Sequence, residues 1–498
     1  MKNIVRNITA AFVIVMCLGS CSQEFLDEVK PTTGVPIESV FETRTTAEGA
    51  LSGIMRRFRT QFPNAAGATS TDTGGVNSLF FARSVKGNDV ISANNWFGSD
   101  YENANREPTF RRSIFTWNYP FYMINQVNSF IKSVKASTFE EKDKNELLGQ
   151  GYALRAFFYH QLVLEFSKSY SEDQNYQAPP IYKEPTTVAK GMSTVKEVYD
   201  FMVEDLTTAI PLLSNSRLGK SFVNKQVGNA ILAQVYQVMG KWDLAEAAAL
   251  AAYGGDQNAV LDAINYNSGF KDNASKEWLW GSPQAADQSM FYYLAPHAFS
   301  DHRAAGYSSI FVNSSFVNLF SATDVRGGIG TEPTKLFSIK ATTIPVTDYR
   351  YYVSNKFSFA FSSHSPIIRY AEMILIDAEA KARQGKDGAA KTVLFALQKN
   401  RDVNAVQSAN TGQALIDEIL VERRKELFME NGVEWFDAKR LGKGIPRDGN
   451  QRLKGPNNAA GPGVTFDLQA HDLRFIIKVP QAEIDSNPLI DDVVNTGK

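Results

Sequence analysis

The chain has 498 residues, of which 43% are hydrophobic and 21% are charged, enough apolar material for a large globular core. Its 52 lysines and arginines balance 53 aspartates and glutamates, so composition gives no electrostatic reason to expect nucleic-acid binding. Aromatic residues reach 12%, and the tyrosines and tryptophans that fall outside predicted helices are candidates for ligand contact.

The first predicted element is an export signal. A basic start (MKNIVRN) precedes an apolar run over residues 8–18. This run is too short to cross about 30 Å of hydrocarbon, which takes a helix of about 20 residues. A charged start, a short apolar run and small residues are the features of a secretory signal. The stretch Leu18–Cys21 resembles the lipobox of bacterial lipoproteins, so we expect residues 1–20 to be removed and Cys21 to carry lipid.

The cysteine content supports this interpretation. Only Cys17 and Cys21 occur, and Cys17 would leave with the signal. The mature protein would then contain no internal disulfide, although export would permit one. Lipid chains on Cys21 would attach the protein firmly, at about 0.8 kcal/mol per buried CH₂. Nothing after Leu18 is long and apolar enough to span a bilayer, and residues 21–36 look like a polar tether.

The folded body is predicted to begin with a helix over residues 40–58. Thr45 or Thr46 can cap it, and Glu48 follows in the manner of a capping box. Residues 63–108 show no helical period and are rich in Gly, Asn, Ser and Asp. We predict a long loop region there.

Pairs of helices follow in chain order. Hydrophobic periodicity predicts helices over residues 122–134 and 139–166, then over 195–213 and 225–253. Within the last range, small and aromatic residues have the spacing of a tetratricopeptide repeat, with a glycine ending the first helix. A second segment has the same spacing. The matching positions are Ala233, Tyr236, Gly240, Trp242, Ala245, Ala249 and Ala252, and then Ala378, Gly385, Ala390, Leu394 and Leu397.

Such helix pairs bury their apolar faces by stacking, so at least three are expected. Between the pairs, residues 256–366 form an irregular insertion in which runs such as YRYYVSNKFSF predict short strands. We therefore predict a mainly α protein whose residues 37–498 make one domain. The repeat-like helices would occupy about 120–253 and 367–440.

Two loop regions, residues 83–106 and 276–299, contain the residue types that bind sugars. A flat ring covers the apolar face of a sugar, and amides and carboxylates bond its hydroxyl rim. The alternative is that these rings pack loops against the helices. The candidate ligand-binding residues are Asp89, Asn94, Asn95, Trp96 and Tyr101 in the first region, and Trp278, Trp280, Gln284, Tyr292 and Tyr293 in the second.

Enzyme motifs find little support. Gly219 to Ser221 resembles the end of a phosphate loop, but the required first glycine is replaced by Ser214. No G-x-S-x-G stretch occurs, and His297 and His302 have a spacing typical of neither a zinc helix nor a hydrolase. A pair of glycosidase carboxylates stays open as an alternative. We expect no catalytic residue, no metal and no cofactor.

Three C-terminal stretches, residues 369–386, 420–444 and 479–490, closely resemble the SusD/RagB family, as do residues 26–35, 151–163 and 198–213. The resemblance implies a scaffold of four tetratricopeptide-like helix pairs with loops and short strands packed on it. It also implies an outer-membrane lipoprotein, facing the cell exterior. Such a protein would capture a glycan or peptide and pass it to a SusC-like TonB-dependent transporter.

The motifs themselves have a structural interpretation. In residues 420–444, Glu422, Arg423, Arg424 and Glu426 can form ion pairs at helical spacings. Leu427, Phe428, Trp435 and Phe436 would be packing residues, and residues 480–488 would fix the C-terminus to the body.

The favoured hypothesis is therefore non-catalytic surface binding of an oligosaccharide or polysaccharide, with millimolar to micromolar dissociation constants (roughly −4 to −8 kcal/mol). The alternatives are peptide capture on the same fold and a repeat-based surface assembly or adhesion lipoprotein.

Overall fold

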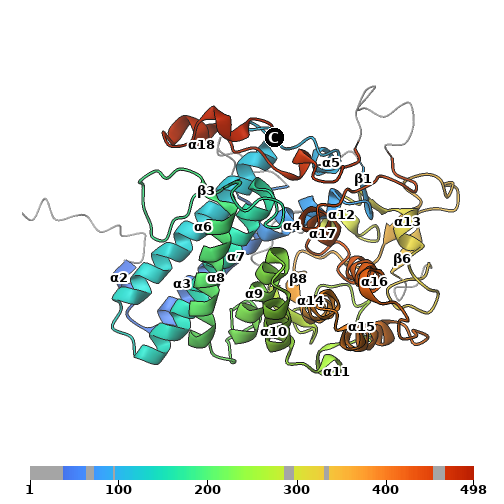
Figure 1. The fold of residues 1–498 in the computed structure, drawn as a ribbon, viewed down its shortest axis with the longest axis horizontal. Helices are drawn as coiled ribbons and strands as arrows, with labels where there is room; N and C mark the ends of the chain where they lie inside the picture. The colour runs from blue at the N-terminus through green and yellow to red at the C-terminus, as the bar shows by residue number, and fades with distance from the viewer. Residues whose placement is uncertain (1–36, 63–71, 94–95, 285–295, 330–335, 453–465) are drawn as a thin grey trace, which may run out of the picture.

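The computed structural model describes residues 37–62, 72–93, 96–284, 296–329, 336–452 and 466–498 (Figure 1). The predicted signal, Cys21 and the tether lie outside these residues, as do Asn94, Asn95, Tyr292 and Tyr293. In the described part of the chain, no helix combines the length and apolarity that membrane crossing requires.

The first helices are α2 (Ile37–Val40) and α3 (Arg44–Arg56), followed by the 3₁₀ turn η2 (Arg57–Arg59). The predicted cap of α3 is wrong by two or three positions. Thr43 is the N-cap, and its hydroxyl and that of Thr46 form a reciprocal capping box. Any Ser or Thr just before an apolar run is a candidate N-cap, and three threonines lie at this point in the sequence, so the pattern alone does not select one.

The region predicted as a long loop contains regular elements. These elements are α4 (Gly75–Val85), β1 (Val90–Ser92) and α5 (Gly98–Tyr101). Every residue of α4 is buried. A helix that is covered on all sides has no polar face and therefore no 3.6-residue hydrophobic period, which is why periodicity missed it.

Three long helices form one half of the scaffold. They are α6 (Arg111–Ala136), α7 (Glu141–Phe166) and α8 (Val195–Leu212), with a small hairpin of β2 (Gln177–Ala178) and β3 (Ser193–Thr194) before α8. Helix α6 begins eleven residues before the predicted Tyr122 and continues through Pro120.

The other half confirms both predicted helix–glycine–helix units. Helices α9 (Lys225–Met239) and α10 (Trp242–Tyr253) meet at Gly240, and α14 (Tyr370–Arg383) and α15 (Asp387–Arg401) meet near Gly385. Both glycines have positive φ, +68° and +72°, the left-handed conformation that glycine adopts without steric strain. Helices α16 (Gly412–Glu426) and α17 (Val433–Arg440) follow (Figure 1).

The insertion contains the predicted short strands. One antiparallel sheet has the order β1-β5-β7-β6, formed with β5 (Ile310–Val312), β6 (Phe337–Ile339) and β7 (Tyr352–Ser354). Strands β4 (Trp278–Ser282) and β8 (Ser365–Arg369) pair separately. The short helix α11 (Gln257–Val260) precedes β4, and the short helices α12 (His297–Ser300) and α13 (Ser314–Val317) lie between β4 and β6 in the chain.

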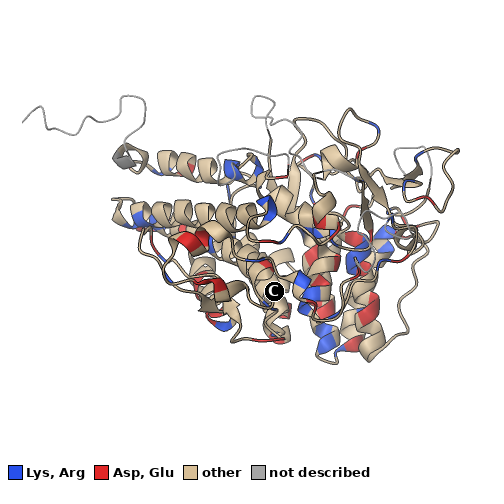
Figure 2. Ribbon diagram, turned by 90° about the horizontal axis from the view of Figure 1, so that it is seen from above, with Lys and Arg blue, Asp and Glu red and all other residues tan. Residues whose placement is uncertain are grey.

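The C-terminal segment is fixed to the body, as predicted. It contains η4 (Leu473–Phe475), α18 (Gln481–Ser486) and η5 (Asp492–Asn495). The Ile477 amide donates to the Glu165 carbonyl of α7 at 2.8 Å, and the Asn495 side chain bonds both backbone groups of Val479. Acidic and basic residues are both spread over the described part of the structure and are not separated onto opposite sides (Figure 2).

Candidate ligand-binding surface

The two predicted ligand regions lie side by side. Strand β1 from the first region pairs with β5, which follows the second region by about ten residues, with Val90 opposite Val312. The Phe97 ring meets the Phe299 ring edge-on, with centroids 5.0 Å apart. Segments separated by two hundred residues in sequence thus share one hydrophobic cluster.

Trp96 is the predicted residue best placed for ligand contact. Its side chain is 44% exposed, and the Arg111 guanidinium lies 5.8 Å from the ring centroid. Arg111 in turn bonds both carboxylate oxygens of the buried Asp72, at 2.9 and 3.2 Å. The arginine is therefore held in place and supports one side of the indole, and Phe110 beside Arg111 is 42% exposed.

Three predicted aromatic residues are instead packed inside the protein. Trp278 and Trp280 are 2% and 0% exposed, and the Trp280 indole donates to the Ser221 carbonyl at 2.8 Å. Tyr101 is fully buried, donates to Gln451 and lies under the Arg447 guanidinium. Burial raises the pKa of Tyr101 to about 12. The structure thus corrects their predicted place at the surface: these rings fill the core, as the packing alternative proposed.

Asp89 is also buried. Its carboxylate pairs with Arg424 of α16, and its backbone amide donates to the Glu434 carboxylate at 3.1 Å. Burial and the neighbouring Glu434 carboxylate raise the pKa of Asp89, although Arg424 opposes this shift. The role of Asp89 in the structure is to join the β1 loop to α16 and α17.

Gln284 remains near the surface. It is half-buried just after β4 and lines a cavity of about 80 Å³ together with Arg59. The Arg59 guanidinium donates to the carbonyls of Ser282 and Ser363. It therefore joins η2 to the end of β4 and to the segment just before β8. Of the predicted ligand residues that the structure describes, Trp96 and Gln284 are therefore the two with exposed surface.

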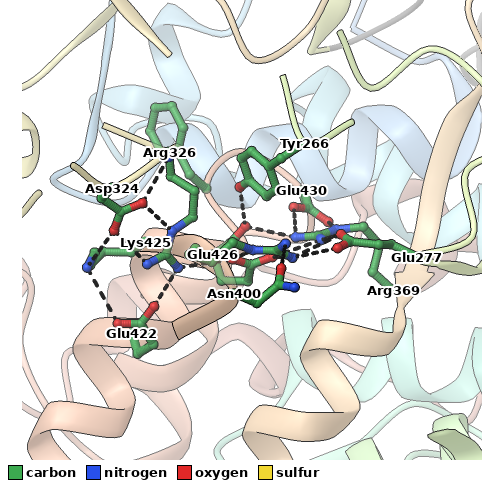
Figure 3. Close-up of polar contacts among 12 residues, drawn as sticks. Tyr266, Glu277, Asp324, Arg326, Arg369, Asn400, Glu422, Lys425, Glu426 and Glu430 are labelled. Atoms are coloured by element: carbon green, nitrogen blue, oxygen red, sulfur yellow. Dashed lines mark hydrogen bonds and ion pairs between the residues drawn. The ribbon is translucent and has the colours of Figure 1, made fainter. Parts of the chain in front are cut away.

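The C-terminal motif forms a buried ion network (Figure 3). Glu426 of α16 accepts hydrogen bonds from three guanidinium groups: those of Arg326, Arg369 and Arg401. Five cations and five carboxylates take part: Arg326, Arg369, Arg401, Lys356 and Lys425, with Glu277, Asp324, Glu422, Glu426 and Glu430. Burial opposes ionisation of Glu426, but the arginines outweigh it and hold its pKa well below the usual range.

This network corrects the prediction of ion pairs at helical spacings. Within the motif, only Glu422 and Lys425 pair along α16, at 3.5 Å. Glu426 pairs with residues of the insertion and of α15, and Arg423 pairs with Asp437 of α17. Leu427, Phe428 and Trp435 are buried, as predicted, and Phe436 packs half-buried against the core. The charged residues therefore join the insertion to the helical scaffold.

In the described residues, no group of three His, Cys, Asp or Glu side chains is placed to hold a metal ion. His297 and His302 are committed to backbone carbonyls, of Phe270 at 2.7 Å and of Ile310 at 2.8 Å. Burial lowers the pKa of each to about 4. Each of these imidazoles therefore stays neutral at neutral pH and holds a loop in place.

Sequence patterns missed a second set of polar and aromatic side chains, on α6. Asn118, Phe121, Asn125 and Asn128 line a cavity of about 280 Å³ with Tyr182. The amides recur at helical spacing in NYPFYMINQVN, which was the available signal.

Packed helix pairs that carry an irregular insertion, with the exposed Trp96 outside it between β1 and α5, define a helical-repeat scaffold. Residues 59–237 match a family model described as "Starch-binding associating with outer membrane", and residues 358–495 match the model of the SusD family. The chain belongs to the SusD/RagB family.

Two relatives illustrate the extent of the similarity. SusD-like protein P38 of Formosa agariphila is 22% identical, over 97% of this chain and 99% of that protein. A SusD-like carbohydrate binding protein of Bacteroides vulgatus has a solved structure with a TM-score of 0.78 and 23% identity, covering 90% of this chain and 98% of the other.

The solved structure of NanU from B. fragilis has a TM-score of 0.67 at 17% identity, covering 93% of this chain and 99% of the other. These structural similarities confirm the mainly α, SusD-like fold.

Proposed function

We propose that this protein is a lipoprotein of the outer membrane that binds a glycan at the cell exterior without transforming it. It would deliver the glycan to a SusC-like TonB-dependent transporter. Family membership, the lipobox-like stretch before Cys21 and the exposed Trp96 support this proposal. The exposure of Trp96 is the main observation behind this proposal, because core packing does not explain an exposed indole that is held by an arginine.

The chemistry of the surface suits a sugar. One face of a pyranose ring presents C–H groups, which an indole covers, while the hydroxyl rim needs hydrogen-bonding partners. Arg111 is fixed to Asp72, so the Trp96 ring needs little ordering when ligand arrives. A shallow contact of this kind gives weak binding, which fits a protein that must release its cargo.

Calorimetry of the protein without its signal, against a panel of oligosaccharides, tests the glycan assignment. Trp96→Ala should weaken binding at least tenfold. Trp242→Ala is the matched control, because Trp242 of α10 is also stacked by an arginine, Arg383 at 4.6 Å, but lies on the scaffold. Binding of a peptide library with no binding of any glycan would reject the sugar assignment in favour of peptide capture.

Membrane extraction tests the anchor and the partner. The full-length protein should co-purify with a barrel transporter from detergent-solubilised outer membranes, and Cys21→Ala should release it into the soluble fraction. Stable membrane attachment without any transporter would favour an adhesion role instead.

A further inference from the structure

A pocket on α6 lies apart from every predicted ligand residue. It has a volume of about 280 Å³, close to the lower end of the roughly 300–1,000 Å³ typical of small-molecule sites. Its walls come from α6, from the loop between β2 and β3, and from Glu483 of α18. In Figure 1 this loop and α18 lie beside the first half of α6.

One wall is aromatic and already ordered. The Phe121 ring lies 4.9 Å from the Trp117 ring and 6.0 Å from the Tyr182 ring. Trp117 is 2% exposed and its indole donates to Glu483 at 3.2 Å, so it forms the floor. Phe121 and Tyr182 are only half-buried and supply the accessible apolar surface.

The loop opposite α6 is fixed by a buried amide. The Asn128 side chain donates to the Tyr182 carbonyl at 2.9 Å and accepts from Arg155 at 2.9 Å. Asn128 is 2% exposed, and Arg155 in turn pairs with Asp205. The pocket is therefore held open by interactions between elements, and no rearrangement is needed to form it.

The remaining polar groups are available to a ligand. Asn118, Asn125 and Glu184 line the pocket, and among the described residues their side chains form no hydrogen bond. Glu184 and Glu483 give the lining two carboxylates, while no lysine or arginine is among the described residues that line it. The amides can donate and accept, whereas the carboxylates require donors such as hydroxyl groups.

We propose that this pocket is a second carbohydrate subsite, which binds a neutral sugar ring. Phe121 and Tyr182 would cover the apolar face of the ring, Asn118 and Asn125 would bond its rim, and Glu184 would accept from its hydroxyls. The two carboxylates would repel an acidic sugar. This subsite rests on the proposed glycan-binding function, but it goes beyond the Trp96 surface and shares no residue with it.

The position of the pocket relates it to Trp96. Arg111, which stacks on Trp96, and Asn118 are seven residues apart on α6. Seven residues are about two turns, so the two side chains lie on one side of the helix about 10 Å apart along its axis. The two subsites thus flank the first turns of one rigid element.

Ligand-observed saturation-transfer NMR tests the subsite. The probes are the methyl glycosides of glucose, galactose and mannose, N-acetylglucosamine, and glucuronate as the acidic counterpart. Phe121→Ala and Asn118→Ala should each raise the Kd of the best neutral probe at least tenfold, while Trp96→Ala leaves binding in this pocket within twofold. Glucuronate should bind at least tenfold more weakly than that probe.

Asn229→Ala on α9 is the matched control for loss of a half-buried helical amide, and thermal unfolding of each variant checks that it is folded. The proposal fails if no neutral probe binds, if glucuronate binds best, or if Trp96→Ala alone removes all binding. Loss through Phe121→Ala with no effect of Trp96→Ala on oligosaccharides would support this subsite and reject the proposed role of Trp96.

Discussion

The carboxylate of Glu426 accepts two hydrogen bonds from the Arg401 guanidinium, at 3.0 and 2.8 Å. The pair joins α16 to the end of α15, and both side chains are fully buried. Two further arginines reach the same carboxylate, so several elements depend on one charge.

Glu426→Gln should therefore be strongly destabilising. It leaves three buried guanidinium groups without their shared anion, and breaking a buried pair typically costs about 3–5 kcal/mol. Urea unfolding measures the loss. Asp417→Asn is the control, because Asp417 and Lys443 form an exposed pair that should be worth at most about 1 kcal/mol. Equal effects of the two substitutions would contradict a central role for the network.

The same site predicts acid sensitivity. The pKa of Glu426 in the folded protein lies well below its unfolded value of about 4.3. The stability that it contributes is thus present above about pH 4.3 and is lost as the pH falls through the folded pKa. The difference in unfolding free energy between wild type and Glu426→Gln should shrink below pH 4. A difference that stays constant between pH 6 and pH 3 would contradict this.

Glu372 of α14 should give the opposite dependence of stability on pH. Burial raises its pKa to about 7, and the carboxylate accepts from Gln234 at 3.0 Å and from Asn431 at 3.1 Å. The folded state holds the proton more tightly, so this contribution to stability is present below about pH 4.3 and is lost as the pH rises through 7. Relative to wild type, Glu372→Gln should gain on the order of 2–3 kcal/mol between pH 5 and pH 8. Parallel pH profiles would show that Glu372 titrates normally.

Gly432 and Gly385 provide a matched test of packing. Both have positive φ, +74° and +72°, so alanine is strained at each. A Cβ at Gly385 meets nothing within 4 Å, whereas one at Gly432 collides with Arg83 of α4, whose carbonyl carbon lies 2.9 Å away. Gly385→Ala should cost about 1 kcal/mol and Gly432→Ala clearly more. Similar losses would mean that α17 can move away from α4.

Two of the three tryptophans predicted for ligand contact, Trp96 and Trp280, should behave differently in unfolding experiments. Trp280→Ala should lower the unfolding free energy by about 3–5 kcal/mol, because it leaves a cavity among Phe58, Phe157 and the Ser221 loop. Trp96→Ala should lower it by no more than about 1 kcal/mol, since the ring is exposed and loses one cation–π contact. A large effect at Trp96 would assign it to the core.

Several features of the fold could be predicted because their signal is local. Gly240 and Gly385 end helices at positions set by repeat spacing. The strand around Tyr352 lies in a run where apolar and polar residues alternate over a short distance. Helix α4 could not be predicted, because complete burial removes its periodicity. The partners of Glu426 were equally hidden: Arg326 lies one hundred residues away, and nothing local indicates the pairing.

The candidate site was harder to predict for a related reason. Trp96 and Trp280 occur in similar stretches of small, polar and aromatic residues, yet one is 44% exposed and the other is fully buried. What separates them is the tertiary environment: Trp280 lies on a strand paired with β8, whereas Trp96 lies outside any helix or strand, just before the short helix α5. Residue type indicated a ring-rich surface but not which rings face solvent.

The backbone bond from Ile477 to Glu165, together with Lys439 reaching the Leu164 carbonyl, has a consequence for how the chain is made. A ribosome releases α6 and α7 long before residues 439–498 exist. The C-terminal end of α7 therefore stays exposed to solvent until the last part of the polypeptide has been synthesised. A nascent chain that stalls before this point would expose the apolar residues around Phe166, a natural target for chaperones and proteases.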